Sequence, residues 1–143
     1  MSSPATSASS LSGNSLLRNA LIILVGSLVA NHLIRIIAAA LTNPIPEFLP
    51  LTSWGPVTIF TFLGVAGAVG FYALLKRFTA NPGRIFTIVA WVLLVLSMIP
   101  NVISGLNPAG APIPGMTFGG AMALALMHLP PALLAIALLP RSR

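Results

Sequence analysis

Residues 16–41 read LLRNALIILVGSLVANHLIRIIAAAL, an apolar run that is long enough to cross a lipid bilayer as one helix. A hydrocarbon core of about 30 Å needs roughly 20 helical residues at a rise of about 1.5 Å each. Three further apolar runs follow, at about 57–75, 85–106 and 116–139. The third run contains Pro100, and we expect its helix to continue past a proline kink toward Leu106. The sequence therefore predicts an all-α integral membrane protein, a four-helix bundle.

The composition excludes a soluble protein and most catalytic chemistry. Of the 143 residues, 57% are hydrophobic and 6% are charged, against roughly 25% charged residues in a typical soluble domain. Glu47 is the only acidic residue, and there is no cysteine. Carboxylate pairs, Ser-His-Asp triads and thiolate sites all need residues that this chain lacks. We expect no catalytic residue, no metal site and no required cofactor, and hence a protein that is not an enzyme.

The positions of the basic residues predict the orientation in the membrane. Six of the seven lie at the start, between the second and third runs, and at the end: Arg18, Lys76, Arg77, Arg84, Arg141 and Arg143; only Arg35 does not fit this pattern. The other two connections, about 42–56 and 100–115, contain no Lys or Arg. Because short basic loops stay in the cytoplasm, both termini are expected there, in the cytoplasmic membrane of a bacterium. Topology thus accounts for the net charge of +6, and no nucleic-acid partner is expected.

Residues 1–15, MSSPATSASSLSGNS, differ in composition from the rest of the chain. They offer too little apolar surface to offset the entropy of ordering, so we expect a disordered tail followed by one transmembrane domain over 16–143. A cleaved signal peptide would begin with basic residues and end in a small-residue cleavage site. The first basic residue is Arg18, and no such site closes the apolar run, so the first span is expected to remain.

Glycines recur in the second and fourth runs, at Gly64, Gly67, Gly70, Gly119 and Gly120. Association in lipid depends on close backbone approach through small residues. Ala66 and Gly70 have small-xxx-small spacing, as do Gly119 and Ala123. These positions predict tight helix packing, either within one chain or between chains. On this hypothesis, Leu at Gly67 or at Gly119 should disrupt assembly.

Three polar residues lie in the outer half of the first run: Asn31, His32 and Arg35. A charged residue at membrane depth usually faces protein or water. Arg35 shares a helix face with Asn31, which is consistent with a binding or ion-handling position. The interpretation that we favour is structural, with Arg35 snorkelling outward or pairing with Glu47 in the adjoining connection.

His128 lies midway along the fourth run, just before Pro130 and Pro131. Two residues without an N–H leave carbonyls unpaired, so a kink is expected there. The kink either forms a ligand pocket or is accommodated by packing. His32 and His128 are the candidate cofactor ligands, for example to haem, but at about 1.5 Å per residue their depths are roughly 22 Å and roughly 16 Å from the inner boundary. This difference in depth argues against the hypothesis that both histidines bind the same haem. The remaining hypothesis is that one of them binds a haem, a pigment or a quinone.

Five short segments carry a resemblance to a known family: PEFLPLT (46–52), TIFTFLGVAG (58–67), KRFTANPGRIF (76–86), LSMIP (96–100) and Met127-His128. With them, the chain after residue 15 resembles a family of small bacterial four-span membrane proteins of unknown function. The resemblance implies the same four-helix architecture. It implies no established activity and no catalytic residue.

The function that we expect is non-catalytic, as an accessory or structural subunit of a larger membrane complex. Its partners would be the lipid bilayer and either other membrane subunits or further copies of the chain. One alternative is a small oligomeric transporter or channel, although proton-coupled transport usually needs a carboxylate in the membrane and Glu47 lies in a connection. The other is a haem, pigment or quinone protein that depends on His32 or His128.

Overall fold

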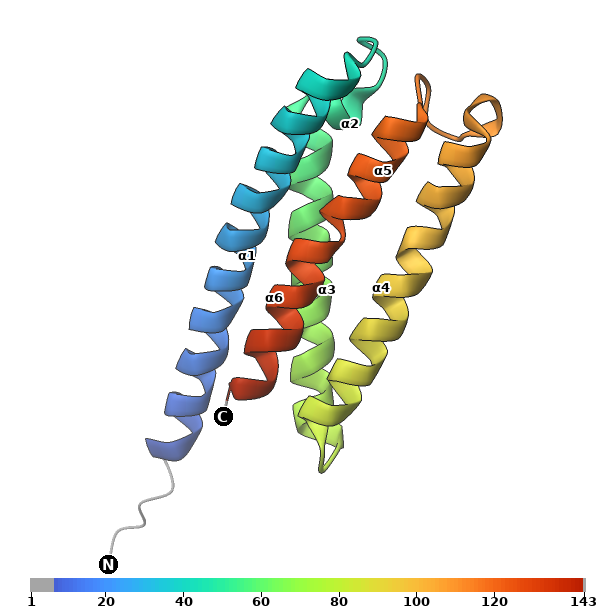
Figure 1. The fold of residues 1–143 in the computed structure, drawn as a ribbon. Coiled ribbons are helices and arrows are strands. Elements are labelled where there is room, and N and C mark those ends of the chain that lie inside the picture. The colour runs from blue at the N-terminus through green and yellow to red at the C-terminus, as the bar shows by residue number, and fades with distance from the viewer. Residues whose placement is uncertain (1–6, 143) are drawn as a thin grey trace, which may run out of the picture.

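A computed structural model describes residues 7–142 of the chain, with side chains over residues 14–142 (Figure 1). Within that part the chain forms helices and no strand. The elements follow in the order α1 (Ser7–Thr42), α2 (Leu49–Thr52), α3 (Trp54–Phe78), α4 (Pro82–Leu106), η1 (Pro108–Gly110), α5 (Phe118–Met127), α6 (Leu129–Leu138) and η2 (Leu139–Arg141).

Four antiparallel columns make up the bundle: α1, α3, α4, and α5 continued by α6 (Figure 1). In the described part of the chain, four helical segments are long and apolar enough to cross a membrane: Asn14–Thr42, Trp54–Phe78, Pro82–Leu106 and Phe118–Arg141. The predicted all-α four-span fold is therefore confirmed. The start of α1, the connection between α3 and α4, and the end of α6 lie at one end of the bundle (Figure 1). The described basic residues other than Arg35 belong to these segments. The short helix α2 lies at the opposite end.

The helix boundaries differ from the predicted ones mainly at the N-terminus. Helix α1 begins at Ser7, so residues 7–15 are helical where we expected a disordered tail, and residues 1–6 lie outside the described part. Extending a helix that an apolar segment has already nucleated costs far less than starting one, which explains the added turns. Helix α4 continues through Pro100 to Leu106, as predicted.

Two clusters of buried side chains form the core. One lies toward the α2 end and contains Phe48, Leu51, Val57, Met116, Ala121, Ala123 and Met127. The other contains Ile23, Val65, Tyr72, Phe86, Ala135 and Leu139. Within it, the Tyr72 and Phe86 rings meet edge to face with centroids 5.4 Å apart, which joins α3 to α4 near their connection.

Polar contacts join the C-terminal end to the rest of the bundle. Asn19 Nδ2 donates to Leu138 O and to Ser142 Oγ, both at 2.9 Å. Lys76 Nζ donates to Ser142 O at 3.0 Å. The end of the fourth column is thus held by side chains from α1 and α3.

The predicted packing glycines fall into two groups. A Cβ at Gly119 would lie 2.7 Å from Thr42 Cγ2, and a Cβ at Gly120 would lie 2.8 Å from Phe48 Cε1, so α5 begins at a close approach that only glycine allows. A Cβ at Gly64, Gly67 or Gly70 would meet no described atom within 4 Å. These three glycines of α3 therefore face open space and do not pack against another helix of the same chain.

We expect Gly120→Ala to destabilise the fold, because the added methyl group would overlap the buried Phe48 ring. Overpacking of this kind costs about 1–3 kcal/mol. Gly64→Ala is the matched control, since the same methyl group there meets nothing and raises helix propensity. Thermal unfolding of the two purified variants in detergent measures the difference, and equal melting temperatures would contradict this account of the packing.

Candidate functional site

A large cleft lies between α3 and α4, where the two helices diverge from their connection. Its volume is about 790 Å³, and α5, α6 and Asn31 of α1 complete its wall. Gly64 and Gly67 of α3 line it, and the absence of their side chains leaves the space open. The volume lies within the range of small-molecule sites, which are roughly 300–1,000 Å³. The cleft is therefore the candidate binding site of this protein.

Most of the residues that line the cleft are apolar, and the polar ones come from different columns of the bundle. They are Asn31 of α1, Thr61 of α3, Ser97 and Asn101 of α4, and His128 at the junction of α5 and α6. A polar group in hydrocarbon is costly unless it is hydrogen-bonded. The bonds that each of these side chains makes therefore determine what the cleft can accept.

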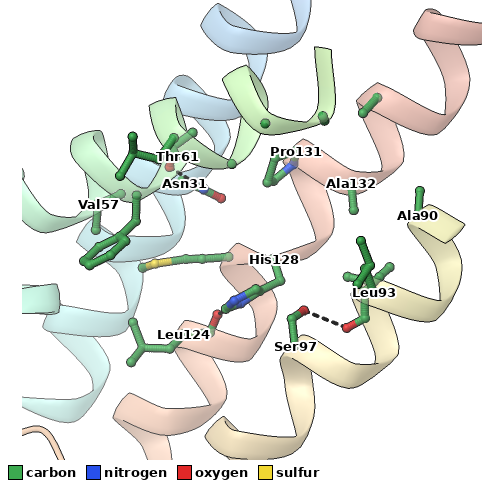
Figure 2. Close-up of a pocket in the computed structure, with 18 of the residues that line it drawn as sticks. Asn31, Val57, Thr61, Ala90, Leu93, Ser97, Leu124, His128, Pro131 and Ala132 are labelled. Atoms are coloured by element: carbon green, nitrogen blue, oxygen red, sulfur yellow. Dashed lines mark hydrogen bonds between the residues drawn. The ribbon is translucent and has the colours of Figure 1, made fainter. Parts of the chain in front are cut away.

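Asn31 has one half of its amide paired and the other half unpaired. The side chain is 3% exposed, and its Nδ2 donates to Thr61 Oγ1 at 2.9 Å. Its Oδ1 is buried and has no hydrogen-bond partner among the described residues. In Figure 2 this oxygen points away from Thr61, toward the space beside Pro131. Asn31 thus holds an unused hydrogen-bond acceptor within the wall of the cleft.

His128 lies at the break in the fourth column, between α5 and α6. Because Pro130 and Pro131 have no N–H, the predicted interruption of the helix occurs there. The His128 ring lies between Leu124 and Ser97 (Figure 2), and its Nδ1 is 2.7 Å from Leu124 O. A carbonyl oxygen only accepts hydrogen bonds, so Nδ1 carries the proton and Nε2 of the neutral ring keeps a lone pair. His128 is therefore a second acceptor in the wall of the cleft.

The two polar side chains of α4 use their donors within their own helix. Ser97 Oγ donates to Leu94 O at 2.7 Å, and Asn101 Nδ2 donates to Ser97 O at 3.0 Å. Such bonds to the preceding turn satisfy the side chain without a partner from another helix. The cleft wall therefore holds two unused acceptors, Asn31 Oδ1 and His128 Nε2. It also holds donor hydrogens that no described bond uses, the second hydrogen of each amide nitrogen and the Thr61 hydroxyl proton.

Arg35 forms a separate cluster toward the α2 end. The side chain is 7% exposed, its Nη1 donates to Leu51 O at 3.0 Å, and its guanidinium carbon lies 4.1 Å from the centroid of the Trp54 ring. The favoured ion pair with Glu47 does not occur among the residues that the structure describes. Glu47 is exposed instead, because the backbone of α2 and the Trp54 ring occupy the positions around Arg35 and the carboxylate stays hydrated.

His32 belongs to this cluster and does not line the cleft. Its Nε2 lies 3.0 Å from Thr58 Oγ1, and its ring centroid lies 4.5 Å from that of Trp54. Thr58 gives its own proton to Trp54 O, so His32 Nε2 is the donor and Nδ1 is the unprotonated nitrogen. The structure therefore places the two candidate ligands, His32 and His128, in different surroundings. No group of three or more His, Cys, Asp or Glu side chains gathers anywhere in the described part.

The sequence analysis singled out Asn31 and His128 but missed their neighbours Thr61, Ser97 and Asn101. Each of these is a polar residue inside an apolar run, which is a signal that the sequence does contain. What the sequence did not contain is the direction of each side chain. The two open glycines of the cleft wall, Gly64 and Gly67, were predicted as packing positions.

Comparison with known proteins yields one family. A model described as a family of unknown function, DUF6069, matches residues 12–143. No curated protein and no solved structure matches the chain.

The surroundings of Arg35 give a testable difference between the two charged residues. We expect Arg35→Gln to lower the free energy of unfolding by about 1–3 kcal/mol, because it removes a charged donor from Leu51 O and the contact with Trp54. Glu47→Gln should leave it unchanged, because Glu47 is exposed. Thermal unfolding of both variants is the measurement. If Glu47→Gln proved as destabilising as Arg35→Gln, that result would contradict this account and support an ion pair between Arg35 and Glu47.

Proposed function

The chain belongs to the DUF6069 family of unknown function, and we propose that it is a non-catalytic membrane protein that serves as an accessory or structural subunit. Its four apolar helices make it a multi-pass integral membrane protein in contact with the lipid bilayer. The subunit role and the identity of the membrane, a bacterial cytoplasmic membrane, are the proposal. The following observations support it.

The distribution of positive charge supports a single orientation. Arg18 lies early in α1, Lys76 and Arg77 end α3, Arg84 is in the first turn of α4, and Arg141 ends η2. All of these positions are at the same end of the bundle, and basic connections are retained on the cytoplasmic side. We therefore assign this end to the cytoplasm and α2 to the opposite surface.

The observation that carries the subunit role is an open groove between α1 and α3. Its volume is about 360 Å³, and its lining residues are Ala20, Leu21, Leu24, Phe62, Val65, Ala66, Val69 and Gly70. Ala66 and Gly70 are the small-xxx-small pair of α3, and a Cβ at Gly70 would meet no described atom within 4 Å. Such pairs let two helix backbones approach closely in lipid. The groove thus fits a transmembrane helix of another membrane protein.

The alternative functions gain no comparable support. A transporter that moves protons needs a carboxylate at membrane depth, and Glu47 is exposed in the connection after α1. Haem ligation by His32 and His128 together needs one shared site, and only His128 lines the cleft.

The test is the native mass of the tagged protein, extracted from its own membranes in a mild detergent. We expect a particle that contains other membrane proteins, and we expect Gly70→Leu to release them because Leu fills the groove. Gly67→Leu is the matched control: the substitution and the helix are the same, but Gly67 lines the cleft on another face of α3. The sequence alone assigned Gly67 to assembly; the present proposal places assembly on the face of α3 that carries Ala66 and Gly70.

Two results would contradict the subunit role. One is a wild-type particle that contains this chain alone, as a monomer or a small oligomer. The other is a particle whose partners remain bound in the Gly70→Leu variant while thermal unfolding shows that the variant is folded.

A further inference from the structure

We propose that the cleft between α3 and α4 binds an uncharged, largely apolar molecule whose polar end donates hydrogen bonds, as a hydroxyl group does. The acceptors are Asn31 Oδ1 and His128 Nε2. This inference is independent of the subunit role, because it concerns the Gly64 and Gly67 face of α3 and not the Ala66 and Gly70 face.

The lining of the cleft determines the apolar part of the ligand. Aromatic and aliphatic side chains from both long helices form its sides, among them Phe60, Phe71, Phe86 and Leu93. The cavity of about 790 Å³ has the size of a site for a small organic molecule or a segment of a lipid chain. Because α3 and α4 both span the membrane, such a molecule enters from the bilayer.

The unused acceptors determine the polar part. Asn31 Oδ1 is buried and unpaired among the described residues, and a lone carbonyl oxygen in hydrocarbon is costly unless a donor reaches it. The lone pair of His128 Nε2 requires a donor as well, since Nδ1 carries the proton. A ligand that offers only acceptors, such as an ether or a ketone, would satisfy neither of these two atoms.

The charges around the cleft exclude a charged headgroup. None of the described residues that line it is Asp, Glu, Lys or Arg. An ion without a countercharge is strongly disfavoured at this depth. The ligand class is therefore a neutral amphiphile with a hydroxyl group, and not a phospholipid headgroup.

The experiment compares two photoreactive probes that differ in one group. The full-length protein in phosphatidylcholine nanodiscs is labelled with a diazirine-bearing hexadecanol or with the methyl ether of the same molecule. The ether keeps the chain and loses the donor. We expect the alcohol to label residues of α3 and α4 with about three- to tenfold preference over the ether, as the loss of one hydrogen bond predicts. Unlabelled hexadecanol should compete, and its methyl ether should compete poorly.

Variants locate the site within the bundle. Gly67→Leu fills the cleft and should abolish labelling, whereas Gly70→Leu lies outside the cleft and should leave it intact. A single hydroxyl proton reaches one acceptor at a time, so at least one of Asn31→Leu and His128→Phe should reduce the preference for the alcohol while the ether still labels. A preference that survives in both variants would contradict the assignment of the acceptors. His32→Phe is the control for His128→Phe, because His32 does not line the cleft.

The proposal is overturned if the alcohol and the ether label equally, if neither labels α3 and α4, or if Gly67→Leu labels like the wild type. Asn31→Leu loses the bond to Thr61 and is open to misfolding, so Gly67→Leu, with a side chain that enters open space, is the deciding variant. Loss of partners in the Gly70→Leu variant tests the subunit role separately, so the failure of either proposal leaves the other standing.

Discussion

Hydrocarbon offers no hydrogen-bond partners, and this constraint determines how the polar residues of this bundle are arranged. Asn31 turns its nitrogen to Thr61, Arg35 turns to the backbone of α2, and His32 turns to Thr58. Each of these bonds crosses from α1 to another element, so the same contacts that satisfy the polar groups also position the helices. Four buried side-chain atoms in the described part still have no partner: Ser27 Oγ, Asn31 Oδ1, His32 Nδ1 and Arg35 Nε. Of these residues, Asn31 is the one that lines the cleft, which is why its oxygen suggests a ligand.

Helix α3 separates two different environments. One face presents Gly64 and Gly67 to the cleft beside α4, and the other presents Ala66 and Gly70 to the groove beside α1. A glycine in a membrane helix usually serves close packing, yet a Cβ at Gly64, Gly67 or Gly70 would meet no described atom within 4 Å. On the two proposals made above, a small amphiphile would occupy the cleft and a helix of another protein would occupy the groove.

The sequence alone predicted the four spans because span length and hydropathy are properties of each segment by itself. The same holds for the break beside His128, which follows from two prolines. The sequence did not predict the partner of Arg35. Leu51 O and Trp54 contact Arg35 and Glu47 does not, and this arrangement depends on how the connection after α1 folds. The sequence also treated Gly67 and Gly119 alike, since helical periodicity defines a face but not what covers it.

The central claim is that the unused acceptors in the membrane mark an occupied ligand site in the cleft. Native mass spectrometry of the protein, extracted from its own membranes and released from detergent in the instrument, tests this most directly. The account predicts that the wild-type chain retains a neutral small molecule and that the Gly67→Leu chain does not, while the Gly70→Leu chain does. A wild-type chain without any bound molecule, or one that retains the same molecule after Gly67→Leu, would contradict it.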